Sequence, residues 1–391
     1  MILIDKPFIS KLFQEQIQQS KIPLILTPAA KELEFLPGIK TLSEEDAIEH
    51  LKRNPNAPVY SSSENALDWV SKHFSFSRLP KLVELFKNKA LFRDRIKPFF
   101  PDFFFKEVHL KKLRDVAHKA LPYPVVLKPS IGFFSLGVHI VNVHEDWHAT
   151  IDKVEKEINQ IQDMYPEAVL DATNFIIEEC ISGDEYAIDA YFNESGNPVI
   201  LNITQHLFSS SDDVGDRVYI TSKDILETVH QPAMKFLKQL AGLDTFVNFP
   251  LHFEVRVDSE KRLVPIEVNP LRFGGWCTTG DLTVHAWQFN PWQYFMEGLV
   301  PDWQSLFQGK ENKVFSMILL NNTTGIHKSG IASFDDKKLL SLFKKPLEFR
   351  AIEQNQYPLF GFLFAESRKD HLEELKYILH SDLSEFITVK G

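Results

Sequence analysis

The residues best suited to chemistry in this sequence are two glutamates and an asparagine in a pair of neighbouring segments. The segments are HFEVRV at 252–257 and LVPIEVN at 263–269, and a short polar turn joins them. Side chains alternate between the two faces of a β-strand, so Glu267 and Asn269 share one face of the second segment. Glu254 lies on the matching face of the first segment if the two form a hairpin. Carboxylate and amide oxygens are ligands that magnesium prefers, together with water and substrate phosphates.

The turn between these strands decides whether the two glutamates meet. A turn formed by 259–262 predicts three cross-strand pairs: Asp258 with Leu263, Glu254 with Glu267, and His252 with Asn269. Directly opposed carboxylates destabilise a strand pair by up to about 1 kcal/mol, so this pairing needs a cation. Two alternatives stay open: a solvent-facing hairpin whose acids are simply hydrated, and a bulge at Pro265 that breaks the register.

A lysine at the end of an apolar strand marks a second candidate site, suited to phosphate. Lys128 follows the predicted strand 125–127 and opens the segment KPSIGFFSLGVHIV. A cation and free backbone N–H groups in such a turn can converge on a polyphosphate, although the segment lacks the P-loop pattern. The alternative is a solvated loop. The turn supplies two glycines, which let the backbone approach a ligand, and two hydroxyl donors: Gly132, Gly137, Ser130 and Ser135.

The segment NPLRFGGW, which follows the second strand of the hairpin, adds a guanidinium at Arg272 beside a glycine turn. A guanidinium binds a carboxylate or a phosphoryl group through two parallel hydrogen bonds. Arg272 is therefore a candidate for holding an anionic substrate group or for stabilising a phosphoryl transition state.

The composition narrows the class of protein. The 391 residues include 43 Lys and Arg against 53 Asp and Glu, which gives a net charge of −10. This charge argues against a nucleic acid bound through neutralisation of its phosphates. The two cysteines, Cys180 and Cys277, lack the spacing of a zinc site or a disulfide framework. The first residues lack a secretory apolar core, and no run of about 18 apolar residues occurs. We therefore expect a cytoplasmic protein with no nucleic-acid partner and no membrane partner.

The elements that must position these residues fall into three parts. Over 1–88, short apolar runs alternate with helical patterns, which predicts βαβ units and a small Rossmann-like α/β domain. This part lacks GxGxxG after its first strand, so we expect no dinucleotide site there. Residues 89–312 carry the chemistry-bearing motifs, and 313–391 predict a small α+β domain. The expected fold class is therefore α/β and α+β with several domains.

Two segments of the central part stand out. Residues 222–241 carry an apolar stripe at helical spacing with Gly242 directly after it, which predicts a helix. Residues 205–222 show no periodicity and predict a long loop, and loops of that length are usually functional or mobile. In that segment, His206 and Arg217 are candidate contacts for an acceptor substrate, with solvated side chains as the alternative.

Taken in order, these motifs resemble the ATP-grasp superfamily, which includes biotin carboxylase, D-alanine–D-alanine ligase and L-amino acid ligases. The resemblance rests on Lys89, then LPYPVVLKPSIGFFSLGV, then FIIEECISGDEYAID, then LHFEVRVDSEKRLVPIEVNP, and it covers roughly residues 1–310. It implies a pre-ATP-grasp domain at 1–88 and an ATP-grasp domain at 89–312, with a mobile lid subdomain at about 121–178.

The resemblance also implies roles for individual residues. Lys89 and Lys128 match the two lysines that contact the phosphates of ATP, and 130–137 match the glycine-rich loop that closes over them. The segment EECISGDE matches the hinge that binds the nucleoside, with these positions: Glu178, Glu179 and Ile181 for adenine, and Glu185 for ribose. The ligands of Mg²⁺, for which Mn²⁺ is a substitute, match the three residues of the hairpin: Glu254, Glu267 and Asn269.

Two residues depart from the family pattern, and both are candidate catalytic residues. In the amino acid ligase branch an arginine directly follows NP, whereas here Leu271 intervenes and Arg272 comes one place later. His252 stands where some members have an arginine that contacts the transferred phosphate. Because histidine is only partly charged at neutral pH, we expect His252 to act through hydrogen bonds.

The resemblance implies an ATP-dependent ligase that joins a small-molecule carboxylate to an amine or a thiol through an acylphosphate, with release of ADP and phosphate. Two alternatives share the motifs: an ATP-binding regulatory or scaffold protein without turnover, and a carboxylase-like or phosphotransfer enzyme. The chain has no lysine-centred biotin attachment motif, which weakens the carboxylase alternative. The motifs encode neither the substrates nor the oligomeric state, for which a homodimer is one candidate.

Overall fold

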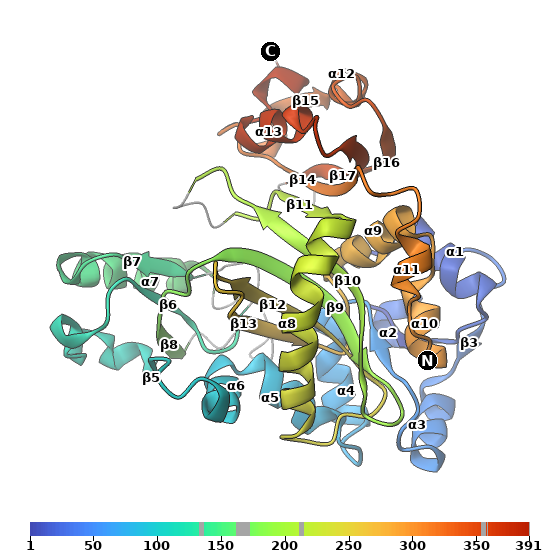
Figure 1. Ribbon diagram of the computed structural model, residues 1–391, viewed down its shortest axis with the longest axis horizontal. Helices are drawn as coiled ribbons and strands as arrows, with labels where there is room; N and C mark the ends of the chain where they lie inside the picture. The colour runs from blue at the N-terminus through green and yellow to red at the C-terminus, as the bar shows by residue number, and fades with distance from the viewer. Residues whose placement is uncertain (133–136, 162–172, 211–214, 353–356, 358, 391) are drawn as a thin grey trace.

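The computed structural model describes residues 1–132, 137–161, 173–210, 215–352, 357 and 359–390. Within them, strands form a four-stranded sheet near the N-terminus, an eight-stranded central sheet, a second four-stranded sheet and a two-stranded sheet. Figure 1 shows the second four-stranded sheet and the C-terminal part projecting from the central sheet as separate lobes. This architecture confirms the predicted combination of α/β and α+β parts.

The N-terminal sheet is parallel, and its strand order is β3-β2-β1-β4. Its strands are β1 (Ile2–Leu3), β2 (Leu24–Ile25), β3 (Thr41–Leu42) and β4 (Tyr60–Ser61). The helices of this part are α1 (Lys11–Gln19), α2 (Pro28–Lys31), α3 (Glu44–Arg53), the 3-10 helix η1 (Glu64–Ala66), α4 (Leu67–His73) and α5 (Leu79–Lys87). The alternation of parallel strands and helices is the predicted Rossmann-like pattern.

Serine side chains cap the helices that follow β3 and β4. The Oγ of Ser43 accepts a hydrogen bond from the N–H of Asp46 at 3.0 Å. After β4, Ser63 caps the 3-10 helix η1, which comes directly before α4. Glu64 is therefore the first residue of η1 and belongs to the end of the sheet where a parallel strand passes into a helix.

The central sheet is antiparallel, with the order β13-β12-β9-β10-β11-β14-β17-β16. Its strands are β9 (Asp184–Phe192), β10 (Pro198–Leu207), β11 (Val218–Thr221), β12 (Phe249–Val257), β13 (Leu263–Pro270), β14 (Lys313–Asn321), β16 (Pro346–Ala351) and β17 (Leu359–Arg368). The predicted helix is confirmed as α8 (Lys223–Ala241), which packs on one face of the sheet. There Phe236 of α8 lies 6.0 Å from Phe253 of β12, measured between ring centroids.

The predicted loop at 205–222 is too long: 205–207 and 218–221 lie in strands, whereas the described residues 208–210 and 215–217 lie outside helices and strands. β10 continues to Leu207, and β11 pairs with it through Gln205 opposite Ile220. The short strand VYIT has too few residues to show an alternating pattern, so only its pairing reveals it. Arg217, beside β11, donates to the carbonyl oxygens of Ile378 and Leu379, so it holds the end of a C-terminal helix.

The lid sheet is our name for the second four-stranded sheet, whose order is β5-β8-β6-β7. Its strands are β5 (Phe105–His109), β6 (Val125–Pro129), β7 (His139–Val141) and β8 (Asn174–Glu179), and helix α7 (Trp147–Ile161) packs on it. Trp147, Ile151 and Val154 of α7 belong to a buried cluster separate from the core of the central sheet. The lid sheet therefore has its own core, and it includes β5, which lies before the predicted lid at 121–178.

The remaining elements connect these sheets and complete the C-terminal part. They are α6 (Lys89–Ile96), α9 (Thr278–Trp287), α10 (Pro291–Glu297), α11 (Trp303–Leu306), β15 (Ile331–Phe334), α12 (Asp336–Leu340), α13 (Glu373–His380) and β18 (Ile387–Val389). Because β14, β16 and β17 extend the central sheet, backbone pairing crosses from the central part into 313–391. The domain limits at 88 and 312 stay predictions.

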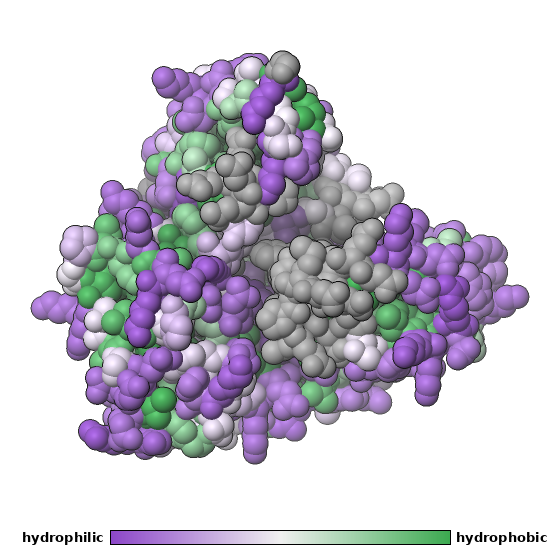
Figure 2. Space-filling model, turned by 180° about the vertical axis from the view of Figure 1, so that it is seen from behind, coloured by the Kyte–Doolittle hydropathy of each residue, from purple (hydrophilic) through white to green (hydrophobic). Residues whose placement is uncertain are grey.

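One face of the molecule is mostly hydrophilic where its residues are described (Figure 2). Figure 2 shows that charged and polar residues dominate the described part of the face opposite to that of Figure 1, with hydrophobic residues only in scattered patches. Among the residues that the structure describes, no helix combines the length and the apolar character needed to cross a membrane.

Gly183 lies where the hinge segment approaches the hairpin, so a substitution at this position tests how close the approach is. We expect Gly183→Ala to lower the free energy of unfolding by more than about 2 kcal/mol. Its φ is +108°, and an added Cβ would lie 2.4 Å from the carbonyl oxygen of Val257. Chemical denaturation measures the loss. In the control Gly298→Ala, φ is +68° but no atom lies within 4 Å of the added Cβ, so about 1 kcal/mol is expected. Equal losses would contradict the close approach.

Candidate functional site

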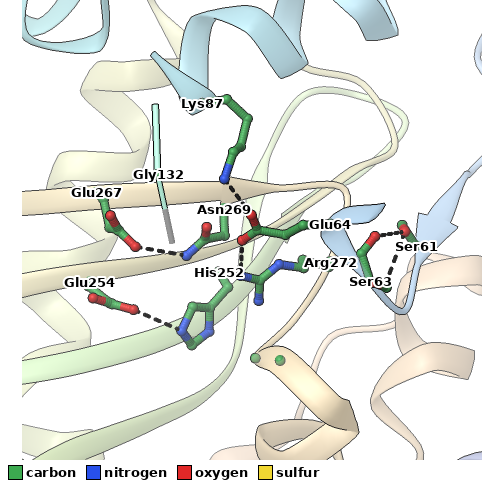
Figure 3. A network of polar contacts seen from close by, with 12 residues as sticks. Ser61, Ser63, Glu64, Lys87, Gly132, His252, Glu254, Glu267, Asn269 and Arg272 are labelled. Carbon is green, nitrogen blue, oxygen red and sulfur yellow. Dashed lines mark hydrogen bonds and ion pairs between the residues drawn. The ribbon is translucent and has the colours of Figure 1, made fainter. Parts of the chain in front are cut away.

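The predicted metal-binding residues lie on the face of the central sheet opposite to α8. Phe253 points toward α8, so the neighbouring His252 and Glu254 of β12 point to the other face. Glu267 and Asn269 of β13 share that face. Figure 3 shows these four side chains pointing into one space, together with groups from other parts of the chain.

The register of the hairpin confirms that the two glutamates face each other. Glu254 pairs with Glu267 and His252 pairs with Asn269. The third predicted pair is wrong, because Leu263 lies opposite Val257 rather than Asp258.

A bulge explains both results. The pairing shifts by one residue after Glu254, where Val255 lies opposite Pro265 and Ile266 has no partner. Without this extra residue, Glu254 would face Ile266 instead of Glu267. The proline that was considered a threat to the register therefore lies beside the bulge that brings the two carboxylates together.

The two facing carboxylates have opposite electrostatic environments. Burial and the charge of Glu267 raise the pKa of Glu254. Burial also opposes the ionisation of Glu267, but Lys89 and other nearby lysines outweigh it and lower its pKa to about 2. Glu267 is therefore ionised at any ordinary pH, and the repulsion that it exerts on Glu254 would be relieved by a cation between them.

The donor set on this face fits magnesium. Glu254, Glu267 and Asn269 offer two carboxylates and an amide oxygen, since Asn269 uses its Nδ2 to donate to Glu267 Oε1 at 3.4 Å. Hard oxygen ligands of this kind, with room for water and phosphates, suit Mg²⁺ or Mn²⁺. In the described residues, no group of three or more His, Cys, Asp and Glu side chains could hold a metal ion. The asparagine is therefore needed to complete the set.

The two predicted phosphate lysines each hold a carboxylate in this structure. The Nζ of Lys89 lies 3.0 Å from Glu267 Oε2 and donates to the carbonyl oxygen of Gly132 at 3.4 Å. The Nζ of Lys128, at the end of β6, forms an ion pair with Glu178 of β8. Both lysines are buried. The lysines thus come from α6 and from the lid sheet, and they meet next to the hairpin.

The pKa values of the two lysines shift in opposite directions because their charged neighbours differ. Burial opposes the charge of Lys89, but Glu267 outweighs burial and raises the pKa. For Lys128, burial prevails over the attraction of Glu178, and Arg93 adds repulsion, so its pKa is lowered. Lys128 therefore has the most to gain from the additional negative charge of a phosphate.

The rest of the predicted phosphate turn is only partly described. The Oγ of Ser130 donates to Glu107 Oε1 at 2.8 Å, so this hydroxyl already has a partner in the lid sheet. Gly137 has φ +69°, a conformation that favours glycine. Ser135 lies outside the described residues.

The hinge segment places the predicted nucleoside residues in different surroundings. The side chain of Glu178 is only 2% exposed and pairs with Arg93 as well as Lys128, and these cations overcome burial to lower its pKa to about 2. This side chain therefore faces Lys128, one of the two predicted phosphate contacts. The N–H of Glu179 donates to the carbonyl oxygen of Phe104, and the carbonyl oxygen of Ile181 accepts from Arg256.

Glu185, the predicted ribose residue, is held from two sides. Its Oε2 lies 3.1 Å from Arg256 Nη2, and its Oε1 lies 3.0 Å from His206 Nδ1. His206 is buried, and its ring stacks on Tyr219 with 4.2 Å between centroids. His206 thus lies beside the predicted ribose position, not in a solvated loop.

His252 is anchored by a buried aspartate that the sequence analysis missed. Its Nδ1 lies 2.7 Å from Asp189 Oδ1, and its Nε2 lies 3.7 Å from Glu254 Oε1. Burial opposes the charge of the ring, but the hydrogen bonds to Asp189 and Glu254 raise its pKa to about 9. His252 is therefore an imidazolium at neutral pH, not the partly charged ring on which the sequence prediction was based. Asp189 also accepts the N–H of Gly274 at 3.1 Å.

Arg272 is buried and bound to a carboxylate from the N-terminal part. Its Nη2 lies 2.5 Å from Glu64 Oε1, and its Nη1 donates to the carbonyl oxygen of Phe273 at 2.9 Å. The other oxygen of Glu64 lies 2.5 Å from the Nζ of Lys87 (Figure 3). Glu64, Lys87, Arg93 and Asp189 were all missed, because each gains its importance from a partner distant in sequence.

Comparison with known proteins agrees with this geometry. Residues 121–280 match the sequence model of the ATP-grasp domain. No curated protein sequence matches the chain. The match confirms the resemblance deduced from the motifs, and the chain contains an ATP-grasp domain.

Solved structures share the fold over nearly the whole chain. The L-amino acid ligase of Bacillus licheniformis has a TM-score of 0.65 at 19% identity, covering 100% of this chain and 98% of that one. A biotin carboxylase–βγ-ATP complex from Campylobacter jejuni has a TM-score of 0.64 at 12% identity, covering 100% and 92%. The biotin carboxylase domain of the 2-oxoglutarate carboxylase of Hydrogenobacter thermophilus, with MgADP and bicarbonate, has a TM-score of 0.60 at 14% identity, covering 100% and 90%.

The ion pairs of Glu64 predict that part of the protein's stability is lost in acid. Burial raises the pKa of Glu64, but Lys87 and Arg272 outweigh it and lower the pKa from 4.5 to about 2. Its contribution to stability is therefore complete above about pH 5 and is lost as the pH falls toward 2. We expect Glu64→Gln to cost a few kcal/mol at pH 7 and much less at pH 3, as measured by urea denaturation. A cost that does not change with pH would contradict the ion pairs.

Proposed function

We propose that this chain, which contains an ATP-grasp domain, is an ATP-dependent ligase that joins a small-molecule carboxylate to an amine or a thiol. The substrate carboxylate attacks the γ-phosphate of ATP, which gives an acylphosphate and ADP, and the second substrate then displaces phosphate. The single observation that carries the proposal is the meeting of Glu254, Glu267 and Asn269 with Lys89 and Lys128 at one place.

The lysines of this site bind and position the phosphates. Lys89 and Lys128 are held by Glu267 and Glu178 in the structure, so each is already next to the place where a phosphate would lie. A phosphate would take over a lysine contact, and the carboxylate left behind keeps other partners, as Glu178 keeps Arg93. Glu254, Glu267 and Asn269 would hold Mg²⁺, which supplies positive charge that neutralises the phosphate oxygens when it is bound.

His252 and Arg272 face the carboxylate substrate in this proposal. The Nδ1 of His252 is fixed by Asp189, so its Nε2 is directed toward Glu254 and the reacting groups. A positive ring there stabilises negative charge that develops on the transferred phosphate. Arg272 lies at the border with the N-terminal part, and its Nη2 already binds Glu64, so a substrate carboxylate has to share this arginine with Glu64.

Two observations support a reaction over mere nucleotide binding. The three proposed metal ligands share one face, and the imidazolium of His252 places a positive charge beside them, although neither feature is needed to bind a nucleoside. The solved relatives include an L-amino acid ligase and biotin carboxylases, and this chain covers them almost completely.

The experiment is a screen of ADP release with ATP and Mg²⁺ over a matrix of amino acids and other small carboxylates and amines. ADP formation that requires both a carboxylate and an amine supports the ligase. ADP formation that requires bicarbonate would replace the ligase by a carboxylase-like enzyme. ATP binding without ADP formation under any pair of substrates would indicate a regulatory or scaffold protein.

The metal site gives a sharper prediction. Glu267→Gln removes a carboxylate that is ionised at any ordinary pH, so Mg²⁺-dependent ADP formation should fall at least about a hundredfold at saturating ATP. Glu260→Gln in the turn of the same hairpin is the control, because Glu260 is 72% exposed and should leave the rate unchanged. Circular dichroism checks that both variants fold. A normal rate in Glu267→Gln at saturating Mg²⁺ would remove this residue from the site.

A further inference from the structure

Helix α6 lies between the lid sheet and the hairpin and presents two cations to both. Lys89 and Arg93 are four residues apart, so they lie on the same face of the helix. Lys89 contacts Glu267 of β13 and the carbonyl oxygen of Gly132, in the turn after β6. Arg93 also contacts one group from each side. Each cation thus bridges the lid side and the metal-binding strand.

The contacts of Arg93 are short and deeply buried. Its Nε lies 2.8 Å from Glu178 Oε2 of β8, and its Nη1 donates to the carbonyl oxygen of Pro265 at 2.7 Å. Its side chain is 2% exposed. The guanidinium lies over the ring of Phe103, 4.4 Å from its centroid. A planar fork of donors holds two such partners in a fixed geometry, which the single ammonium of a lysine does not reproduce.

Both partners of Arg93 matter for the proposed reaction. Glu178 is also the ion-pair partner of Lys128, so Arg93 keeps this carboxylate in place and compensated when Lys128 turns to a phosphate. Pro265 lies directly before Ile266, the bulge residue that brings Glu267 opposite Glu254. β13 is at the edge of the central sheet, and Arg93 gives the carbonyl of Pro265 a partner that is not a strand.

The contacts of Lys89 and those of Arg93 should respond differently to a bound nucleotide. Lys89 is a proposed phosphate contact, so its contact with Glu267 has to change when a nucleotide enters. Arg93 lies one turn further along the helix and is sealed between Glu178, Pro265 and Phe103. Its bridge can therefore persist while Lys89 and Lys128 exchange partners.

We propose that Arg93 is a positioning residue that ties the lid sheet to the metal-binding strand. The inference rests on the proposed function, because it gives Arg93 the task of fixing the spacing between Lys128, which would hold phosphate, and the Glu254–Glu267 pair, which would hold Mg²⁺. Arg93 touches neither ligand itself. The loss of Arg93 should therefore reduce the factor by which Mg²⁺ raises the affinity for the nucleotide. It should have a smaller effect on the affinity for either ligand alone.

The test is a calorimetric titration with ADP, in the presence and in the absence of Mg²⁺. It is carried out on the wild type and on Arg93→Lys. In the wild type, Mg²⁺ should raise ADP affinity by about tenfold or more, a common size for coupling between two ligands. In Arg93→Lys this factor should fall to about threefold or less, while the affinity for ADP alone changes little. The matched control is Arg95→Lys on the same helix, since Arg95 is 41% exposed and pairs with Asp244 at the surface.

The outcomes separate this inference from others. An undiminished Mg²⁺ effect in Arg93→Lys would overturn it, and so would an equal loss of ADP affinity with and without Mg²⁺. If Arg93→Lys does not fold, Glu178→Gln approaches the same bridge from the lid sheet and should reduce the same factor.

A second readout does not depend on nucleotide binding. Hydrogen exchange without ligands should rise together in β8 and β13 of Arg93→Lys, and it should stay unchanged in both strands of Arg95→Lys. If the wild type shows no effect of Mg²⁺ on ADP affinity, the proposed function fails. The exchange result then still decides whether Arg93 joins the two strands, and unchanged exchange in β8 and β13 would overturn that as well.

Discussion

Two carboxylates facing each other across a hairpin set the condition that the rest of the site has to meet. The register of β12 and β13 places Glu254 opposite Glu267, and burial together with the repulsion from Glu267 raises the pKa of Glu254. Water alone does not solvate them, since both are partly buried. Positive charge must therefore come from outside the hairpin. In the structure it comes from Lys89 on α6 and from His252 on the same strand, and in the proposed reaction also from magnesium.

The same balance of charge extends outward through ion pairs that join separate parts of the fold. Glu178 forms ion pairs with Lys128 and Arg93, and Glu64 forms ion pairs with Lys87 and Arg272. Breaking a buried pair by removing one partner is far more costly than the pair is worth, because a lone charge remains. The N-terminal part, the lid sheet and the central sheet are thus held in register by charges that also serve the proposed chemistry.

Local patterns in the sequence were sufficient for much of this. Alternation and a short turn predicted that Glu254 meets Glu267 and that His252 meets Asn269, although the pairs form only because the bulge at Ile266 offsets the error in the predicted turn. The end of an apolar strand marked Lys128. The prediction failed where pairing is not local. The strand VYIT is too short to show a period, and Asp189 reads as one more buried strand residue until its contact with His252, 63 residues away, is known. Arg93 and Glu64 likewise reach across 85 and 208 residues.

The order of the strands also limits how this protein can associate with other chains. The central sheet, as described, ends in β13 on one side and β16 on the other, and both edge strands contain proline, at 265 and 270 in β13 and at 346 in β16. A proline has no N–H to offer a neighbouring strand, and it is one of the devices by which sheet edges avoid pairing. Self-association by extension of this sheet is therefore disfavoured at both ends, and a dimer would have to form through side-chain surfaces instead.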